Sequence, residues 1–365
     1  MPANRPFRLL IVRTGAMGDV LHAMPAVAAL RLRHPEWQIG WAIEPRWRAL
    51  LQAESCPASK PPLVDHVHEV PTREWNQRPF SVTTFREIMH LRRELQVEQY
   101  ELCVDMQGLL RSAVVGRFAR AGVFAGPAAP REGLARWLYQ VRIETRAAHV
   151  IDRGCELLGG AVGEPLVAAP VPLPADPSAE RWCDEQLGTL LPGNPAGRFV
   201  MLAPTAGWGA KRWPVERYGA VAAALAKAGY TPLINAADQN DLVAAAVVKA
   251  SGGRALPVVC SLAQLIVLLR RTSLIIAGDT GPLHLAAALQ RPLVALYGPT
   301  DPDRTGPYGM RKDVIRHSSS RQDHRRHSVP EKGLSQITVE EVTAAALHAM
   351  QATPHSLETI IQGDR

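Results

Sequence analysis

The chain has 365 residues, a hydrophobic fraction of 47% and a formal net charge of +7. That length predicts about two domains, and the positive charge favours anionic partners such as phosphorylated metabolites, nucleic acid or an anionic membrane surface. The five cysteines lie far apart without a CxxC pair, which excludes a disulfide framework and a zinc–thiolate site. We expect no signal peptide and no membrane span, because the first apolar stretch ends at Arg13 and no apolar run reaches about 18 residues.

The chain opens with an apolar segment, Arg8–Val12, followed by RTGAMGDVLHAMPAV, Arg13 to Val27. The first segment predicts a buried strand, and Leu21–Leu32 predicts an amphipathic helix. A glycine-containing turn between a strand and a helix usually holds phosphate on the helix N-terminus. Here Asp19 places a negative charge at that point, so its carboxylate either caps the helix or has a chemical role.

Six further segments are short, apolar and unalternating, as strands buried on both faces are: Gln38–Ile43, Leu102–Asp105, Phe199–Ala203, Thr231–Ile234, Leu274–Ala277 and Leu293–Tyr297. Helical patterns between them predict parallel sheets wrapped by helices. The proline-rich stretch from Gly163 to Glu180 predicts a linker, because spaced prolines fit neither a helix interior nor a central strand. We therefore expect an α/β protein of two doubly wound, Rossmann-like domains facing a central cleft. The expected divisions are residues 1–170, residues 171–345, and a helix end and tail over 346–365.

The second half of the chain holds two candidate anion sites. In APTAGWGAKRWPVERYG, Ala203 to Gly219, Thr205, two glycines and Lys211 follow a predicted strand. Such groups can hold a phosphate, although the P-loop pattern is absent and a solvated basic loop also fits. In GDTGPLH, which begins at Gly278, Asp279 or Thr280 can cap a helix whose free N–H groups suit a pyrophosphate. This turn also fits a capped strand–helix connection and nothing more.

Four stretches together resemble the lipopolysaccharide heptosyltransferases, most closely heptosyltransferase I: LLIVRTGAMGDVLHAMPAVAAL, VDMQGLLRSA, AKRWPVERYG and GDTGPLHLAAALQRPLVALYGPTDP. The resemblance covers roughly residues 8–350. It implies the GT-B fold and an inverting, metal-independent enzyme without a cofactor. This enzyme would move heptose from ADP-heptose to a lipid-borne, Kdo-lipid A type acceptor. It would be cytoplasmic and peripheral at the anionic inner face of the inner membrane.

The resemblance also implies roles for individual residues. Asp19 is the implied general base. The implied donor-binding residues are Thr205, Lys211, Asp238, Asp279, Thr280, Gly281 and His284. Candidate residues on the acceptor side are Arg13, Gly18, Arg73, Arg78, Gln107 and Arg111. Arg111 stands where the family usually has lysine, and the two cations differ in geometry. The carboxylate that would bind the adenosine ribose is either Asp238 or Asp241.

Two segments of the second half do not fit the family pattern cleanly. Asp301 to Asp303 reads DPD, which is like the metal-binding DxD motif of other glycosyltransferases. The proline between the two aspartates favours a loop, so we predict no metal site here. The basic run from Arg311 to Ser328 is either a loop near an anionic acceptor or a solvated insertion. Its three histidines, His317, His324 and His327, lack convincing ligand spacing.

One segment of the first half is a candidate membrane surface. From Pro130 to Arg146, apolar residues recur at helical spacing and arginines surround them. The apolar positions are Leu134, Trp137, Leu138 and Val141, and the arginines are Arg131, Arg136, Arg142 and Arg146. An amphipathic helix of this kind suits an anionic interface, but the same stripe can pack against the N-terminal domain.

Other classes of protein share some of these features. A GT-B-like sugar-nucleotide epimerase would have the same architecture, and a related heptosyltransferase could use another acceptor. A nucleic-acid-binding module fits the charge, but the basic run lacks aromatic residues that stack on bases, so we expect no nucleic-acid partner. A dehydrogenase fits poorly, because GAMGDV is not G-x-G-x-x-G and puts Asp19 where a pyrophosphate would lie.

Overall fold

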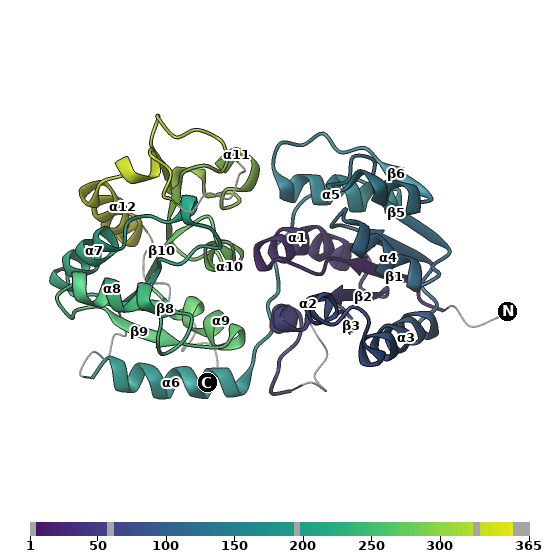
Figure 1. The fold of residues 1–365 in the computed structure, drawn as a ribbon, viewed down its shortest axis with the longest axis horizontal. Coiled ribbons are helices and arrows are strands. Elements are labelled where there is room, and N and C mark those ends of the chain that lie inside the picture. The colour runs from purple at the N-terminus through teal and green to yellow at the C-terminus, as the bar shows by residue number, and fades with distance from the viewer. Residues whose placement is uncertain (1–4, 57–61, 193–197, 324–328, 353–365) are drawn as a thin grey trace, which may run out of the picture. The chain divides into compact units, whose positions relative to one another are not determined.

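The computed structural model describes residues 5–56, 62–192, 198–323 and 329–352. The chain forms two compact units, Met1–Glu180 and Arg181–Arg365. Each unit is a parallel sheet covered by helices (Figure 1). The segment from Gly163 to Asp176 contains no helix or strand, and the boundary between the units falls within α6, Pro177–Leu190. None of the described helices is long and apolar enough to cross a membrane.

The N-terminal unit has a six-stranded sheet in the order β3-β2-β1-β4-β5-β6. Its strands are β1 Arg8–Val12, β2 Gln38–Ile43, β3 His66–Glu69, β4 Leu102–Asp105, β5 Val123–Pro127 and β6 Val141–Ile143. Its helices are α1 Met17–Arg33, α2 Thr72–Gln77, α3 Val82–Val97, α4 Leu110–Phe118 and α5 Val150–Val162, with 3-10 turns η1 Pro45–Leu50 and η2 Gly133–Leu138. The chain reverses its strand order between β1 and β4, which is where doubly wound sheets bind ligands.

The C-terminal unit repeats this topology in the order β12-β11-β10-β7-β8-β9. Its strands are β7 Phe199–Ala203, β8 Thr231–Ala236, β9 Leu256–Val259, β10 Leu274–Gly278, β11 Leu293–Tyr297 and β12 Val314–Arg316. Its other helices are α7 Val215–Lys227, α8 Leu242–Ala250, α9 Leu262–Arg271, α10 Gly281–Ala288, α11 Pro302–Thr305 and α12 Val339–Ala352, with 3-10 turns η3 Gly209–Lys211, η4 Arg311–Asp313 and η5 Leu334–Gln336. The reversal here lies between β7 and β10, so the loops that follow these two strands form the expected ligand edge.

The buried strands form where the sequence predicts them. All seven expected strands are present, and β1, β7, β10 and β11 are buried along all or nearly all of their length. Side chains from one face of the C-terminal sheet, including Val200, Ile276 and Leu296, pack with residues of α7 and α12 in one core. The expected last helix is α12, and Thr338 and Glu341 form the capping hydrogen bonds at its start.

One helix prediction is confirmed in part and another is wrong. The helix predicted over Leu21–Leu32 is present as α1, but it begins earlier, at Met17, and it is not amphipathic over its middle turns, because every residue from Val20 to Leu30 is buried and α1 packs against α5. The segment from Pro130 to Arg146 is not an α-helix. It forms the short η2 and then β6. Val141–Ile143 pairs with β5 as a strand, so these residues cannot continue a helix from η2.

Candidate active site

Asp19 lies in the first turn of α1, just beyond the carboxyl end of β1. It is not the helix cap, because the N-cap residue is Ala16, which makes no side-chain capping bond. Instead its carboxylate lies between two guanidinium groups. Arg13 Nη2 is 3.0 Å from Oδ1, and Arg131 donates from Nη2 to Oδ1 at 3.1 Å and from Nη1 to Oδ2 at 3.2 Å.

The positive charges of the two arginines keep the Asp19 carboxyl group ionised. Burial raises the pKa of its carboxyl, but the charges of Arg13 and Arg131 outweigh that effect and bring the pKa to about 2. The two arginines differ in exposure: Arg13 is buried and also donates to the Met106 carbonyl, whereas the Arg131 side chain is half exposed. Asp19 is therefore an ionised carboxylate with one buried and one half-exposed partner.

A buried carboxylate on β4 holds the neighbouring loops in place. Asp105 accepts hydrogen bonds from the Tyr139 hydroxyl at 2.7 Å, the Ser112 hydroxyl at 2.9 Å and the Gln107 backbone N–H at 2.8 Å. Gln107 is itself buried, and its side-chain oxygen accepts from the N–H and hydroxyl of Thr14 at 2.8 Å each. The ends of β1 and β4 are thus tied together beside Asp19.

The other candidates on the acceptor side are more dispersed. Gly18 precedes Asp19 in α1, Arg111 is exposed in the first turn of α4, and Arg73 and Arg78 are exposed at the two ends of α2. Within the described residues, Asp19 pairs with Arg13 and Arg131 and with none of these three arginines.

The donor candidates of the C-terminal unit gather around Asp279, at the end of β10. Lys211 Nζ is 2.6 Å from Asp279 Oδ2, His284 Nε2 is 2.9 Å from Oδ1, and the Tyr297 hydroxyl is 3.3 Å from Oδ1. Burial raises the pKa of Asp279, but the hydrogen bond and charge of His284 and the charge of Lys211 outweigh it and hold the pKa well below its usual range.

The start of α10 lies directly beside this cluster. Thr280 is its N-cap residue, and Gly281 is the first helical residue. The Thr280 hydroxyl donates to the Gly278 carbonyl at 3.2 Å and accepts no capping hydrogen bond from the helix, so no side chain caps the first backbone N–H groups of α10. Uncapped N–H groups and a lysine at the carboxyl end of a parallel strand suit a phosphate group.

The remaining donor candidates lie on loops of the same unit. Thr205 follows β7 and is partly exposed. Asp241 is the N-cap of α8 and accepts from the N–H groups of Val243 and Ala244, whereas Asp238 is exposed and accepts only a local bond from Asn240. Of the two carboxylates left open by the sequence, Asp238 is the one whose side chain is not committed to a helix cap.

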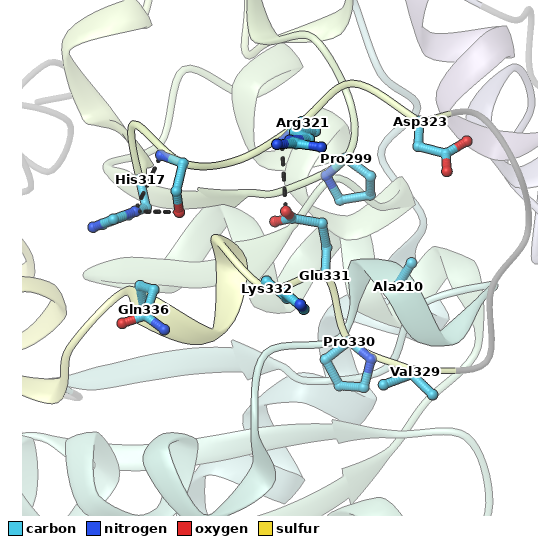
Figure 2. A pocket seen from close by; sticks show the side chains of 11 residues that line it. Ala210, Pro299, His317, Arg321, Asp323, Val329, Pro330, Glu331, Lys332 and Gln336 are labelled. Atoms are coloured by element: carbon cyan, nitrogen blue, oxygen red, sulfur yellow. Dashed lines mark hydrogen bonds between the residues drawn. The ribbon is translucent and has the colours of Figure 1, made fainter.

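The two segments that depart from the family pattern have local structural partners. Asp301 caps α11 by accepting from the Asp303 N–H, and Asp303 pairs with Arg311 at 2.8 Å. The described part of the basic run lines a pocket of about 860 Å³ within the C-terminal unit (Figure 2). There the Glu331 carboxylate accepts hydrogen bonds from the backbone N–H groups of Arg321 and Leu334 and from the Ser320 hydroxyl. His324 and His327 lie outside the described residues.

Sequence reasoning missed three residues of these sites. Arg131 was expected on a membrane-facing helix, not on Asp19, since pairing across 112 positions of sequence leaves no local signal. Asp105 ends a predicted strand, and Tyr297 ends another, and their apolar neighbours gave no indication of a polar role.

Comparison with known proteins identifies the family of the chain. The sequence pattern described as glycosyltransferase family 9 (heptosyltransferase) matches residues 88–334, more than half of the chain. The chain belongs to glycosyltransferase family 9. Among curated members, the lipopolysaccharide heptosyltransferase 1 of Pseudomonas aeruginosa is 29% identical over 83% of this chain and 81% of its own. That of Escherichia coli K12 is also 29% identical, over 85% of this chain and 93% of its own.

Solved structures of family 9 members agree with the fold. The E. coli heptosyltransferase WaaC with ADP is 26% identical, with a TM-score of 0.74 over 94% of this chain and all of that one. The family 9 glycosyltransferase of Veillonella parvula superposes with a TM-score of 0.78 at 19% identity, over 97% of this chain and 99% of that one, which shows the shared fold. The expected GT-B class is confirmed, and so is the expectation of a glycosyltransferase of the heptosyltransferase family.

Proposed function

We propose that this glycosyltransferase moves heptose from ADP-heptose to a Kdo-lipid A type acceptor during synthesis of the lipopolysaccharide inner core. One observation carries the proposal: the residues that match the family motifs gather into two charged sites. Asp19 lies between two arginines in the N-terminal unit, and Lys211, Asp279 and His284 cluster at the start of α10 in the C-terminal unit. The names of the related heptosyltransferases and the ADP in the WaaC structure support the substrate classes.

On the donor side, Lys211 and the uncapped end of α10 would hold the pyrophosphate. Lys211 is paired with Asp279, so the donor phosphates would share or replace that pair. As the bond between the anomeric carbon and the phosphate oxygen breaks, negative charge grows on ADP. A lysine and a helix N-terminus already aimed at that point stabilise it without reorganisation.

On the acceptor side, Asp19 would be the general base. The acceptor oxygen attacks the anomeric carbon as its hydroxyl proton passes to Asp19, and ADP leaves from the opposite face, so one displacement inverts the anomeric configuration. A carboxylate with a pKa of about 2 is a weak base. The half-exposed Arg131 is the partner that can leave Asp19, and its departure raises the basicity of the carboxylate at the moment it is needed.

The proposed chemistry uses side chains and backbone groups for charge stabilisation, and needs neither a metal ion nor a cofactor. Activity that is unchanged after dialysis against EDTA supports this part of the proposal. Loss of activity that Mg²⁺ or Mn²⁺ restores contradicts it.

A second candidate differs only in the acceptor. The lipopolysaccharide heptosyltransferase 2 of Salmonella typhimurium is 27% identical over 85% of this chain, which favours an acceptor that already carries a heptose as the alternative. Membership of family 9 favours group transfer over the epimerase, dehydrogenase and nucleic-acid alternatives.

A substrate screen tests the proposal. The purified protein is incubated with ADP-heptose or with UDP- and GDP-sugars, and with Kdo-lipid A or a heptosylated acceptor, and nucleotide release and product mass are measured. We expect ADP release that depends on Kdo-lipid A. Equal turnover of a UDP-sugar overturns the donor assignment, and turnover only with the heptosylated acceptor supports the second candidate.

Because the proposed acceptor is attached to a lipid, the enzyme would have to reach a membrane surface. We propose a cytoplasmic enzyme that binds the inner face of the inner membrane peripherally. Cell fractionation that finds the protein in the membrane pellet at low salt and in the supernatant at high salt supports this, because salt screens attraction to an anionic surface.

A further inference from the structure

Apolar side chains are exposed together where η2 packs against α4. Leu134 and Trp137 of η2 are 67% and 66% exposed, and Leu110 and Val114 of α4 are also exposed. The same turn is firmly anchored, because Ala135 and Tyr139 are buried and Tyr139 reaches Asp105. Leu134 and Trp137 are therefore held outward by a rigid turn.

Arginines border these apolar side chains. The guanidinium carbon of Arg136 is 4.9 Å from the centre of the Trp137 ring, and that of Arg142 is 5.5 Å from it. The one carboxylate within η2 and its flanks, Glu132, accepts from the Leu110 N–H at 2.7 Å. We call the four apolar residues together with Arg136 and Arg142 the Trp137 face.

The Trp137 face adjoins the proposed base. Arg131, which pairs with Asp19, lies two residues before η2 in the chain. The segment that carries the Trp137 face thus also carries a guanidinium partner of Asp19. This continuity matters because the proposed acceptor is attached to a lipid.

We propose that the Trp137 face docks the protein on an anionic phospholipid bilayer. This inference rests on the proposed function. Trp and Leu favour the boundary between headgroups and acyl chains, and guanidinium groups pair with headgroup phosphates. The arginines stacked on Trp137 place positive charge and apolar surface at the same level, as an anionic interface requires. The acceptor sugar then meets Asp19 while its lipid stays in the bilayer.

A second exposed apolar group offers a matched comparison. Phe80, Val82 and Phe85 surround the start of α3, and Phe80 is completely exposed. Arg78 and Arg86 flank them. This group is similar in size and charge but belongs to the start of α3 and the turn before it, not to the η2 region that holds Arg131.

Vesicle co-sedimentation of the full chain tests the inference. Vesicles of phosphatidylcholine alone are compared with vesicles containing phosphatidylglycerol and cardiolipin. The variants are Leu134→Ser with Trp137→Ser, Arg136→Gln with Arg142→Gln, and the control Phe80→Ser with Phe85→Ser. We expect both Trp137-face variants to bind anionic vesicles at least about 5- to 10-fold more weakly than the wild type, and the control to bind as the wild type does.

Three results would overturn the inference: wild-type protein that does not bind anionic vesicles, Trp137-face variants that bind as tightly as the wild type, or a loss confined to the Phe80 control. Melting temperatures equal to that of the wild type establish that the variants are folded. A water-soluble acceptor fragment separates this inference from the proposed function. The Leu134→Ser, Trp137→Ser variant should turn over that fragment normally and a vesicle-embedded acceptor slowly, whereas absence of turnover of both substrates by the wild type contradicts the proposed function itself.

Discussion

At the scale of single residues, both sites are built from carboxylates whose charge is fixed by cations. Asp19 is held by Arg13 and Arg131, and Asp279 by Lys211 and His284. The sequence predicts most of these residues, because each follows a predicted strand in a recognisable motif. It does not predict the pairing of Arg131 with Asp19, which joins residues 112 positions apart and depends on no local pattern.

Replacement of Asp19 tests its role as the base. Asp19→Asn keeps the shape of the side chain and removes the proton acceptor, so kcat should fall by about 10²–10⁴-fold while ADP binding is unchanged. Steady-state kinetics and calorimetric titration with ADP measure the two quantities. Asp152→Asn changes a first-turn aspartate of α5 and is the control. Turnover by Asp19→Asn that equals the control would leave Asp19 without a catalytic role.

Replacement of Arg131 tests its ion pair with Asp19 through pH dependence. The pKa of Asp19 is about 2 because Arg13 and Arg131 lower it, so Asp19 stays ionised throughout the ordinary working range. Arg131→Gln removes one lowering charge and raises that pKa. The acid limb of kcat/KM on a soluble acceptor should therefore move to higher pH. Arg136→Gln is the control, and an acid limb that is the same in both variants contradicts the predicted pairing.

Replacement of Lys211 tests the donor site. Lys211→Ala should weaken ADP binding by about 1.5–3 kcal/mol, the usual contribution of a hydrogen bond to a charged group. The neighbouring Arg212 is exposed and donates to the Ala206 carbonyl, so Arg212→Ala is the matched control. Isothermal titration with ADP gives both values, and equal affinities for the two variants would refute the phosphate assignment.

At the scale of elements, the strands that are buried on both faces are the ones that the sequence predicts. Central strands are covered on both faces and appear as apolar runs, so β1, β4, β7 and β10 are predicted to within a residue. The missed strands are short or contain polar residues and proline, as in HVHE of β3 and LPVV of β9. Edge strands form because a neighbour offers backbone partners, and that neighbour is not visible in their own sequence.

The junction of β4, α4 and η2 depends on the buried carboxylate of Asp105. Asp105→Ala leaves the Tyr139 and Ser112 hydroxyls and backbone N–H groups without their acceptor. We expect the free energy of unfolding to fall by about 2–4 kcal/mol, against about 1 kcal/mol for Tyr139→Phe, which removes one bond. Urea unfolding followed by circular dichroism measures both, and equal losses would mean that Asp105 is not the common acceptor.

At the scale of the whole molecule, two units of the same topology carry different sites on equivalent strand ends. In each unit the functional side chains follow the strands at which the order reverses, β1 and β4 or β7 and β10. The topology thus explains why motifs far apart in sequence converge within a unit. The sequence pattern predicts the topology, while the partners of each side chain follow only from its packing.

The paired carboxylates also set the response of the whole fold to acid. The pKa of Asp279 in the folded protein is lowered, so the folded state binds fewer protons there than the unfolded state. The stability from this group is complete above the unfolded value of about 3.9 and is lost as pH falls below it. The melting temperature should drop as pH falls from about 4 to about 2, and less so for Asp279→Asn. An equal drop in both proteins would contradict this contribution.

The proposed reaction is an inverting transfer of heptose, and the anomeric configuration of the product distinguishes it from a retaining reaction. Wild-type protein is incubated with ADP-heptose and a soluble Kdo acceptor, and the new glycosidic bond is assigned by NMR. A single displacement with Asp19 as base predicts a bond of the opposite configuration to the donor. A product that retains the donor configuration, or ADP release without a new glycosidic bond, would contradict the account.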